Sequence, residues 1–337
     1  MIREAIQALV LGKSLTMDEA SSVMDEIMEG QVTPAQFGAF VTALRLKGET
    51  ADEISGMAKV MRAKAIRVTI ADPVIDIVGT GGDGLNSFNI STVTAFVVAG
   101  AGLKVAKHGN RAASSQCGSA DVLEALGVNL KLTAEQVQRC IEEVGIGFMF
   151  AQAFHPAMKY AGPPRREIGI RTVFNILGPL TNPAWAKNYL LGVADGSLVE
   201  KMALVLKSLG CNHALVVHGG DGLDEITISG KTQVCELKNG RIKKYTVSPE
   251  DFGLPTASLE SLKGGTAQEN ANLLRNILTG ASGPQRDVVL MNAAAALVAG
   301  DKAKTLRQGL DLAREALDSG RALAKLEQLI KLTRSFA

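Results

Sequence analysis

The first seventy residues show the hydrophobic pattern of amphipathic helices. Apolar side chains recur three and four positions apart, as at Phe37, Phe40 and Leu44, so that each segment has one face to bury. Three sequences have the capping-box form, in which side chains at both ends satisfy the first free amides of a helix. They are Thr16-x-x-Glu19, Thr33-x-x-Gln36 and Thr50-x-x-Glu53. The pattern predicts a small all-helical unit of about four helices.

After Asp72-Pro73 the pattern changes to short apolar runs separated by helical segments. The runs expected as strands cover residues 74–78, 103–106, 189–193 and 214–218. Helical patterns cover residues 90–99, 120–126, 134–144, 197–209, 266–278, 287–299 and 306–329. Asn239-Gly240, between residues 233–237 and 241–247, is a hairpin signal and predicts an antiparallel extension. The predicted fold class is α/β, with a small N-terminal helical domain and a larger α/β domain built on a mostly parallel central sheet.

Length, charge and composition narrow the class of protein. The 337 residues suggest about two domains. The 36 Lys and Arg against 34 Asp and Glu leave a net charge of +2, which argues against a dedicated nucleic-acid binder. A hydrophobic share of 46% excludes disorder as a description of the whole chain. The 35 glycines exceed the average usage of about 7%, and only 4% of residues are aromatic. We therefore expect a core of Ala, Val, Leu and Ile, and the glycines require an explanation.

The cysteines and the apolar segments indicate the compartment. Cys117, Cys140, Cys211 and Cys235 form no CxxC pair, and a chain of this length needs no disulfide to fold. The N-terminal residues lack the pattern of a signal peptide. The longest apolar stretches, residues 93–103 and 288–299, are shorter than the roughly 18 residues of a membrane helix. We expect a soluble cytoplasmic protein with reduced thiols.

The strongest chemical signal is the run Gly79-Thr80-Gly81-Gly82-Asp83-Gly84, directly after the first predicted strand. Glycines let backbone amides approach a ligand closely, as phosphate-binding loops require. Shortly afterwards, Asn89-Ile90-Ser91-Thr92 opens a helix, and free amides at a helix N-terminus attract anions. Taken alone, either motif is explained by a turn or a helix cap. Together, after a strand, they favour a phosphate ligand.

The glycine pattern does not fit the common nucleotide motifs. The Walker pattern GxxxxGK[ST] is missing, while Gly79, Gly81 and Gly84 satisfy the GxGxxG pattern of dinucleotide-binding folds. However, the helix begins about five residues too late for that fold, and the next strand ends at Lys107 rather than at an acidic residue that binds a ribose. We therefore discount a dinucleotide.

Two further polar segments follow predicted strands. Residues 107–115 and 118–121 gather two cations, an amide and three hydroxyls, and Ser119 is placed to cap the next helix. Residues 79–127 hold nine glycines in 49 positions, nearly twice the density of the whole chain. Farther along, Asp224-Glu225 presents adjacent carboxylates, which suit Mg²⁺ shared with phosphate oxygens. Such a pair alone is more often a solvated turn, and the phosphate loops favour the metal.

The motifs, in their order along the chain, resemble those of the anthranilate phosphoribosyltransferases. They are GTGGD at 79–83, NIST at 89–92, KHGNRAASSQCGSADVLEALG at 107–127, Arg165-Arg166, GIRTVFNILGPLTNP at 169–183, and Asp224-Glu225. The resemblance covers nearly the whole chain, including its helical start. The chain departs from the family at Leu85-Asn86-Ser87, where small residues and a threonine are expected, although Ser87 keeps a hydroxyl.

The resemblance implies which residues bind the substrates. Phosphoribosyl pyrophosphate would contact Gly79, Gly82, Asp83, Ser87, Asn89, Ile90, Ser91, Thr92, Lys107, His108, Gly109, Asn110, Arg111, Ala112, Ala113, Ser114, Ser115 and Ser119. Anthranilate would contact Gly79, His108, Asn110 and Arg165. Ser91, Asp224 and Glu225 would hold two Mg²⁺ ions per subunit.

The resemblance also implies an activity and an organisation. The phosphoribosyl group of 5-phosphoribosyl 1-pyrophosphate would pass to the amine of anthranilate, giving N-(5-phosphoribosyl)anthranilate and pyrophosphate in tryptophan biosynthesis. Positioning and the metal would drive this displacement without a dedicated catalytic residue. The helical domain would cover residues 1–70, with a segment near 160–185 packed on it, and the α/β domain residues 71–337. The substrates would lie between the domains of a homodimer formed through the helical domain, with neither nucleic acid nor membrane as a partner.

Two other functions are weighed against this interpretation. A pyrimidine nucleoside phosphorylase would share the glycine loop and the Lys-His start, but it would be longer and continue with serine rather than Gly109-Asn110-Arg111. A relative that binds nucleic acid would show a basic excess and lose Asn110 and Arg165. Both are disfavoured.

Several other reactive side chains have ordinary structural interpretations. We expect Arg166 to be a surface charge and His155 to be structural rather than part of the site. His213 and His218, which flank an apolar strand, are expected as satisfied core or edge residues. A thiol nucleophile at Cys117 is not expected, because a direct displacement needs no covalent intermediate.

Overall fold

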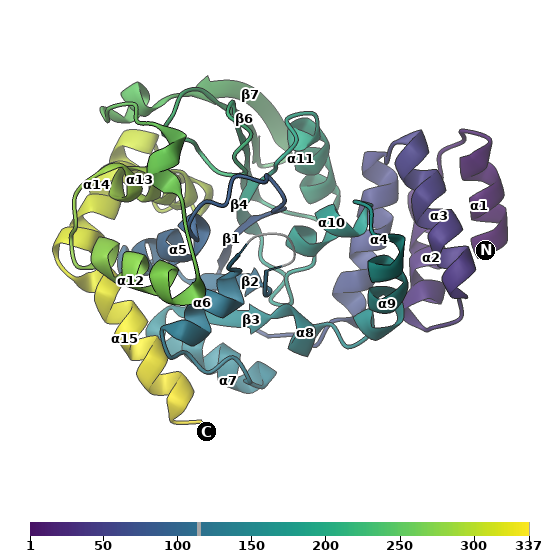
Figure 1. Cartoon of the computed structure of the whole chain (residues 1–337), viewed down its shortest axis with the longest axis horizontal. Helices are drawn as coiled ribbons and strands as arrows, with labels where there is room; N and C mark the ends of the chain where they lie inside the picture. The colour runs from purple at the N-terminus through teal and green to yellow at the C-terminus, as the bar shows by residue number, and fades with distance from the viewer. Residues whose placement is uncertain (113–115, 337) are drawn as a thin grey trace.

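The computed structural model describes residues 1–112 and 116–336 (Figure 1). Ala113, Ser114 and Ser115, which the sequence analysis assigns to the phosphate site, lie outside the described residues. The N-terminal unit consists of α1 (Ile2–Val10), α2 (Met17–Met28), α3 (Pro34–Lys47) and α4 (Ala51–Lys64). The three capping boxes are confirmed, because the hydroxyls of Thr16, Thr33 and Thr50 each accept the amide three residues on at 3.2–3.3 Å.

A seven-stranded sheet forms the centre of the larger unit. Its strands are β1 (Ile75–Gly79), β2 (Val105–Gly109), β3 (Ile146–Phe150), β4 (Asn188–Gly192), β5 (His213–Gly219), β6 (Thr232–Lys238) and β7 (Arg241–Val247), in the order β3-β2-β1-β4-β5-β6-β7. The first five strands run parallel, and β6 and β7 form the expected antiparallel extension. The mostly parallel α/β sheet beside a helical unit is confirmed.

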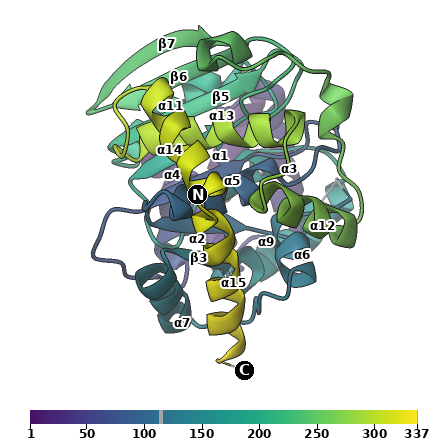
Figure 2. The ribbon, with the colours of Figure 1, turned by 90° about the vertical axis from the view of Figure 1, so that its left-hand side faces the viewer.

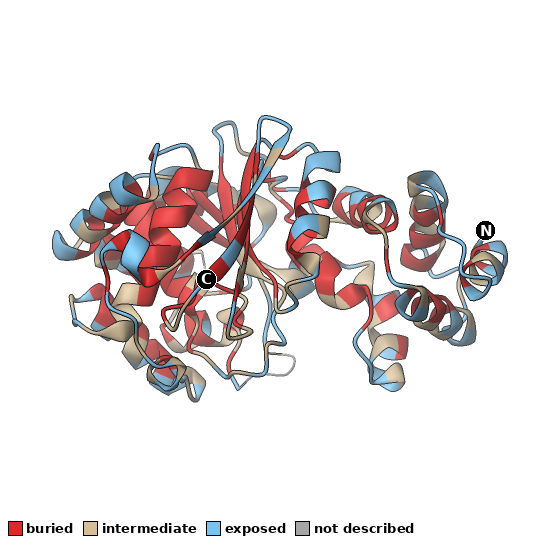
Figure 3. Ribbon diagram, turned by 90° about the horizontal axis from the view of Figure 1, so that it is seen from above, coloured by how far each residue is buried: buried red, intermediate tan, exposed pale blue. Residues whose placement is uncertain are grey.

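Helices cover both faces of the sheet. On one side α5 (Ile90–Gly100), α13 (Pro284–Ala299), α14 (Leu306–Asp318) and α15 (Arg321–Arg334) pack together, as Figure 2 shows from that side. On the other, α11 (Leu198–Ser208) contacts β5, β6 and α4, and so joins the sheet to the helical unit. Buried residues concentrate in the strands and in the helix faces that cover them (Figure 3).

The shorter helices connect these layers. They are α6 (Ser119–Ala125), α7 (Ala134–Arg139), the π-helical turn η1 (Cys140–Val144), α8 (Ala151–Phe154), α9 (Met158–Ile168), α10 (Phe174–Leu177), the 3₁₀ turns η2 (Gly178–Leu180), η3 (Pro249–Phe252) and η4 (Leu259–Leu262), and α12 (Ala267–Leu278). Helix α9 packs against α2 and α3, so the chain returns from β3 to the N-terminal unit (Figure 1). The ring of Phe174 on α10 lies 5.3 Å from the ring of Phe37 on α3, which adds a second contact to the N-terminal unit.

Three elements differ from the pattern-based expectation. Strand β3 is absent from the predicted strands, because Gly147 weakens the strand pattern. A methyl group on Gly147 would meet the Val137 carbonyl oxygen at 2.9 Å, so glycine permits α7 to pack on the strand. The helical pattern over residues 306–329 is two helices, α14 and α15, separated at Gly320, where φ is +74°. The expected helix over 134–144 ends as the π-helical turn. Within the described residues, no helix combines the length and the apolar character that crossing a membrane requires.

Candidate active site

The predicted motifs meet at one edge of the sheet. Strands β1 and β2 end at Gly79 and Gly109, where the two polar loops begin, and β5 ends at Gly219, five residues before Asp224. Because β1, β2, β4 and β5 are parallel, their carboxyl ends lie at the same edge. The structure therefore brings together three motifs that lie far apart in the sequence.

The glycine loop after β1 is held by its own protein neighbours. Gly81 N–H donates to Asp224 Oδ2 at 2.7 Å, and Thr80 N–H donates to the Gly192 carbonyl at 3.0 Å. Gly81, Gly82 and Gly84 have φ between +65° and +75°, a conformation that favours glycine. The backbone of the loop is thus shaped by contacts within the protein itself.

Arg171 braces this loop and is not among the residues singled out from the sequence. Its guanidinium donates to the Gly82 carbonyl at 2.7 Å and to the Gly81 carbonyl at 3.2 Å. The residue lies within the segment 169–183 that carries the family resemblance, so the sequence contains the signal without a role attached to it. Its charge also lowers the pKa of nearby Arg165, second to the effect of burial.

Two glycines make room for the acidic pair. Gly79 and Gly192 are register partners at the carboxyl ends of β1 and β4. A methyl group on Gly79 would collide with Asp224 Oδ2, and one on Gly192 would collide with the Asp224 carbonyl oxygen. Some of the glycines, inside residues 79–127 and outside them, therefore allow other parts of the chain to approach the backbone closely.

The acidic pair combines a buried carboxylate, Glu225, with a half-buried one, Asp224. Burial, followed by repulsion from Asp83, raises the pKa of Asp224 to about 6. Burial and then Asp224 raise the pKa of Glu225 well above its ordinary value, while Lys107 and the Ser91 backbone oppose this. Among residues 1–112 and 116–336, no group of three or more His, Cys, Asp or Glu side chains is arranged to hold a metal unaided. Two crowded carboxylates beside a phosphate-type loop fit a divalent cation that takes its remaining ligands from substrate and water.

Lys107 lies beneath the loops rather than on their surface. It is 3% exposed, and its ammonium donates to the Ile77 carbonyl at 2.7 Å and to Ser91 Oγ at 3.2 Å. Burial lowers the pKa of Lys107, and the charges of Asp76 and Glu225 act in the opposite direction. Lys107 therefore partly balances the carboxylates around it.

Asp76, inside β1, is a buried member of the site that the sequence analysis did not identify. Its carboxylate accepts Asn182 Nδ2 at 2.7 Å and the His108 amide at 3.2 Å. Burial raises the pKa of Asp76 to about 6, against these hydrogen bonds and the charge of Lys107. It ties the end of β2 to the loop that carries Asn182.

His108 is paired with His155. Their Nε2 atoms lie 3.2 Å apart, and both side chains are buried. Burial lowers the pKa of His155 to about 4, and burial followed by His155 lowers the pKa of His108 well below its ordinary value. The pair is therefore neutral at neutral pH, and His155 supports a residue expected near anthranilate.

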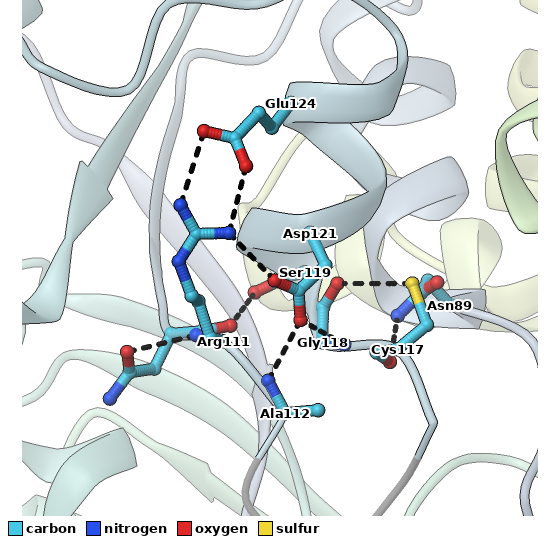
Figure 4. A network of polar contacts seen from close by, with 9 residues as sticks. Asn89, Arg111, Ala112, Cys117, Gly118, Ser119, Asp121 and Glu124 are labelled. Atoms are coloured by element: carbon cyan, nitrogen blue, oxygen red, sulfur yellow. Dashed lines mark hydrogen bonds and ion pairs between the residues drawn. The ribbon is translucent and has the colours of Figure 1, made fainter. Parts of the chain in front are cut away.

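Asp121 joins Ala112 and Gly118 in the second polar loop (Figure 4). We call these two residues the neck of the loop. Asp121 Oδ2 accepts the amides of Ala112 and Gly118, each at 2.9 Å. Arg111 donates to Asp121 Oδ1 and Glu124 Oε2, both at 2.8 Å. The expectation that Ser119 caps the next helix is wrong: the N-cap is Gly118, and the Ser119 hydroxyl donates to the Asn110 carbonyl at 3.3 Å instead.

The first turn of α5 presents mainly its backbone. Ile90 and Thr92 are buried, and the Thr92 hydroxyl has no hydrogen-bond partner among the described residues. The Ile90 amide is taken by the Phe88 carbonyl at 2.7 Å, so the predicted set of free amides is smaller than the motif suggested. Asn89 does not cap the helix with its side chain. Ser87 pairs with Lys263 through an isolated antiparallel bridge.

The remaining candidates are placed as follows. Arg165 on α9 is half-buried, whereas its neighbour Arg166 is exposed. Asn110 is exposed at the end of β2, and its Oδ1 accepts the Arg111 amide at 2.8 Å. His213 contacts Asp301 and Glu236, and His218 contacts the Val193 carbonyl, as expected of satisfied histidines.

The cysteines have the surroundings of structural side chains. All four lie in the described residues as buried free thiols. Burial raises the pKa of the Cys117 thiol, which disfavours the thiolate form that acts as a nucleophile.

Comparisons with known proteins agree with this arrangement. The model of the glycosyl transferase family α/β domain matches residues 71–323, and that of the glycosyl transferase family helical bundle domain matches residues 3–65. Anthranilate phosphoribosyltransferase from Dehalococcoides mccartyi (strain ATCC BAA-2266 / KCTC 15142 / 195) is 63% identical over 339 residues, covering 100% of this chain and 99% of that protein.

Solved structures show the same similarity in three dimensions. The anthranilate phosphoribosyltransferase of Thermus thermophilus is 47% identical with a TM-score of 0.93, covering 98% of this chain and 99% of that one. The Saccharomyces cerevisiae anthranilate phosphoribosyltransferase in complex with PRPP and Mg is 30% identical with a TM-score of 0.91, covering 99% of this chain and 98% of that one. Sequence, fold and motifs agree over the full length, and the chain belongs to the anthranilate phosphoribosyltransferase family.

Proposed function

We propose that this chain transfers the phosphoribosyl group of 5-phosphoribosyl 1-pyrophosphate to the amine of anthranilate, releasing pyrophosphate, as a step of tryptophan biosynthesis. The observation that carries the proposal is the meeting of the Gly79 loop, the Lys107 loop and Asp224-Glu225 at one sheet edge. The relative from yeast, solved with PRPP and Mg, supports the same substrate and ion.

In this proposal the diphosphate and ribose lie against backbone rather than against a row of free cations. The loop amides from Gly82 onward would supply donors, and the N-terminus of α5 would add the positive end of its helix dipole. Lys107 is engaged by Ile77 and Ser91, and Arg111 by Asp121 and Glu124. In this conformation the side chains of Lys107 and Arg111 are both engaged by protein groups rather than available to bind phosphate.

We further propose that Asp224, Glu225 and Ser91 hold two Mg²⁺ ions together with the substrate. When bound, magnesium would supply positive charge at the oxygens of the leaving pyrophosphate. The crowding that raises the pKa of both carboxylates supports this assignment, because a cation relieves it.

Replacing Asp224 with Asn and Glu225 with Gln should reduce kcat/KM by roughly 100-fold or more and raise the Mg²⁺ concentration needed for half-maximal rate. Rates measured across a Mg²⁺ titration test this. Asp72→Asn is the matched control, because Asp72 pairs with Lys104 beyond the opposite end of β1. Wild-type magnesium dependence in the double variant would contradict the metal assignment.

For the acceptor, the half-buried Arg165 offers a guanidinium whose two N–H donors match a planar carboxylate. The amine of anthranilate is weakly basic and loses its proton as the C–N bond forms, so no strong base is needed before attack. Asn110 and the neutral His108 would line the same space. The chain would act by holding the two reactants in line.

The direct test is to mix the protein with phosphoribosyl pyrophosphate, Mg²⁺ and anthranilate and to follow anthranilate consumption together with pyrophosphate release. We expect turnover that requires all three additions. No anthranilate consumption, with cleavage of a pyrimidine nucleoside by inorganic phosphate instead, would favour a phosphorylase and overturn the proposal.

We also propose a homodimer formed through the helical domain, in the cytoplasm. A groove of about 660 Å³ between α1 and α3 is lined by Ile6, Leu9, Val10 and Leu46, among others. Val10 and Leu46 are 71% and 83% exposed, and exposed aliphatic side chains that line one groove are typical of an interaction surface. A second copy of the chain would cover them. In this organisation residues 1–70 and the segment near 160–185 form the helical domain, and the rest of 71–337 forms the phosphoribosyl-binding domain.

A further inference from the structure

A chain of amide contacts links helix α12 to both phosphate-type motifs. Gly265 N–H donates to Asn270 Oδ1 at 2.8 Å. Asn270 Nδ2 donates to Asn89 Oδ1 at 3.0 Å, and Asn89 Nδ2 donates to the Cys117 carbonyl at 3.0 Å. The contact between Asn89 and Asn270 joins residues 181 positions apart. Asn89 precedes the first turn of α5, and Cys117 adjoins the neck of the second loop (Figure 4).

The direction of these hydrogen bonds is set at both ends by the backbone. A backbone N–H can only donate, so Gly265 requires Asn270 to turn its oxygen toward it. A backbone carbonyl can only accept, so Cys117 requires Asn89 to turn its nitrogen toward it. The two side-chain amides between them then have a single arrangement in which every contact pairs a donor with an acceptor. Asn270 is 3% exposed, so water does not offer it alternative partners.

The segment before α12 also lies directly against the segment before α5. Phe88 N–H donates to the Leu262 carbonyl at 2.9 Å, and Gly264 N–H donates to the Asn86 carbonyl at 2.8 Å. A methyl group on Gly264 would meet Phe88 Cα at 2.8 Å, so the two backbones are as close as glycine permits. This contact holds Asn270 at a fixed distance from Asn89.

We infer that Asn270 is a positioning residue for phosphoribosyl pyrophosphate, acting through Asn89 on the start of α5 and on the neck of the second loop. Its hydrogen bonds with Gly265 and Asn89 involve neither residue of the acidic pair. The inference rests on the proposed function for the identity of the substrate. It assigns to α12, which carries none of the motifs, a role in aligning the two loops.

Asn270→Asp tests the direction of the contacts with an isosteric change. One carboxylate oxygen can still accept Gly265 N–H, but the other then faces Asn89 Oδ1. If Asn89 turns its amide around, its oxygen faces the Cys117 carbonyl. Asn270→Ala removes the contact without adding charge. We expect both variants to raise KM for phosphoribosyl pyrophosphate roughly tenfold, while kcat and KM for anthranilate change by less than about threefold.

Asn188→Ala is the matched control for losing a buried amide. Asn188 is buried at the start of β4, at the opposite end of the strand from the site, and its Nδ2 donates to the Ala299 carbonyl at 2.6 Å. We expect this variant to lower the unfolding temperature and to leave KM for phosphoribosyl pyrophosphate unchanged. If Asn270→Asp does not fold, Asn270→Ala and Asn270→Ser provide the same comparison.

A double-mutant cycle with Asn89→Ala shows whether Asn270 acts through Asn89. We expect Asn270→Ala to have little further effect on binding of phosphoribosyl pyrophosphate with Mg²⁺, measured by calorimetry, once Asn89 is alanine. Folded Asn270 variants with wild-type KM, or effects that add fully with Asn89→Ala, would overturn the inference. A wild-type chain that does not bind phosphoribosyl pyrophosphate would overturn the proposed function instead.

Discussion

Arg165 and Arg166 are neighbours in sequence with different surroundings, and this difference makes a prediction at the scale of one residue. Arg165 is half-buried beside Arg171, whereas Arg166 is exposed. A hydrogen-bonded charge pair contributes about 1.5–3 kcal/mol, so Arg165→Ala should raise KM for anthranilate roughly 10- to 150-fold. Arg166→Ala should stay close to wild type in the same steady-state assay. Equal effects of the two substitutions would show that the carboxylate is bound elsewhere.

The buried histidine pair predicts a pH dependence of stability. Burial lowers the pKa of His155 to about 4 from an ordinary value of 6.5. Below pH 6.5 the unfolded chain binds a proton that the folded chain refuses until about pH 4, so the free energy of unfolding falls as pH drops through this interval. The contribution of His155 amounts to about 3 kcal/mol.

Urea unfolding between pH 7 and pH 4 measures this effect. His155→Gln should show a shallower fall in stability than wild type, because glutamine does not titrate, and the remaining slope should include the contribution of His108. An identical slope in the two proteins would contradict a neutral buried His155.

Residues in the site differ in how far the sequence could reveal them. The glycine loop and Asp224-Glu225 follow strands, and residues 107–112 span the carboxyl end of β2, so their meeting at one edge was predictable. The role of Asp76 was not predictable, because a single polar residue within an apolar strand is also expected where one face of the strand is exposed. Asn270 and Arg171 were not predictable, because the contacts that link them to the site join Asn270 to Asn89 over 181 positions and Arg171 to Gly82 over 89 positions. Contacts at such separations depend on packing that no local pattern contains.

At the scale of elements, Asp121 makes the second loop depend on the first turn of α6. Its carboxylate holds the amides of Ala112 and Gly118, and also Arg111. Asp121→Ala should raise KM for phosphoribosyl pyrophosphate at least roughly fivefold, because two amides lose their acceptor. Glu124→Ala removes only an exposed partner of Arg111 and should stay within about twofold of wild type. Steady-state kinetics on both variants show whether the backbone contacts of Asp121, or only the ion pairs of Arg111, support binding of phosphoribosyl pyrophosphate.

Element boundaries show a similar division between what is local and what is not. The capping boxes at Thr16, Thr33 and Thr50 begin their helices as predicted, because the information lies within four residues. Strand β3 and the N-cap at Gly118 were not predicted, because the glycines there are required by backbone outside each element, at Val137 for Gly147 and at Arg111 and Ala112 for Gly118. Gly118 is needed where a methyl group would meet the Ala112 nitrogen and the Arg111 backbone.

At the scale of the whole molecule, the groove between α1 and α3 predicts self-association. Leu46→Glu places a charge where 83% of an aliphatic side chain is exposed, so the monomer should fold normally. A dimer that buries Leu46 should dissociate, because an unpaired charge in an interface is strongly unfavourable. Light scattering after size-exclusion chromatography measures the mass, with Leu204→Glu, at a 42% exposed leucine on α11 outside the groove, as the control. Unchanged mass in Leu46→Glu would place the dimer contact on another surface.

The order of the strands has a bearing on where chemistry can occur at all. From β1 the chain adds β2 and β3 in one direction, and from β4 it adds β5 in the other. The connections that leave β1 and β4 therefore turn away from each other and open a crevice at their carboxyl ends, the topological switch point of a doubly wound sheet. The crevice is a consequence of the strand order and does not depend on which side chains line it. Different loops grafted onto the same winding would inherit a binding site at this place, and only the identity of its ligand would change.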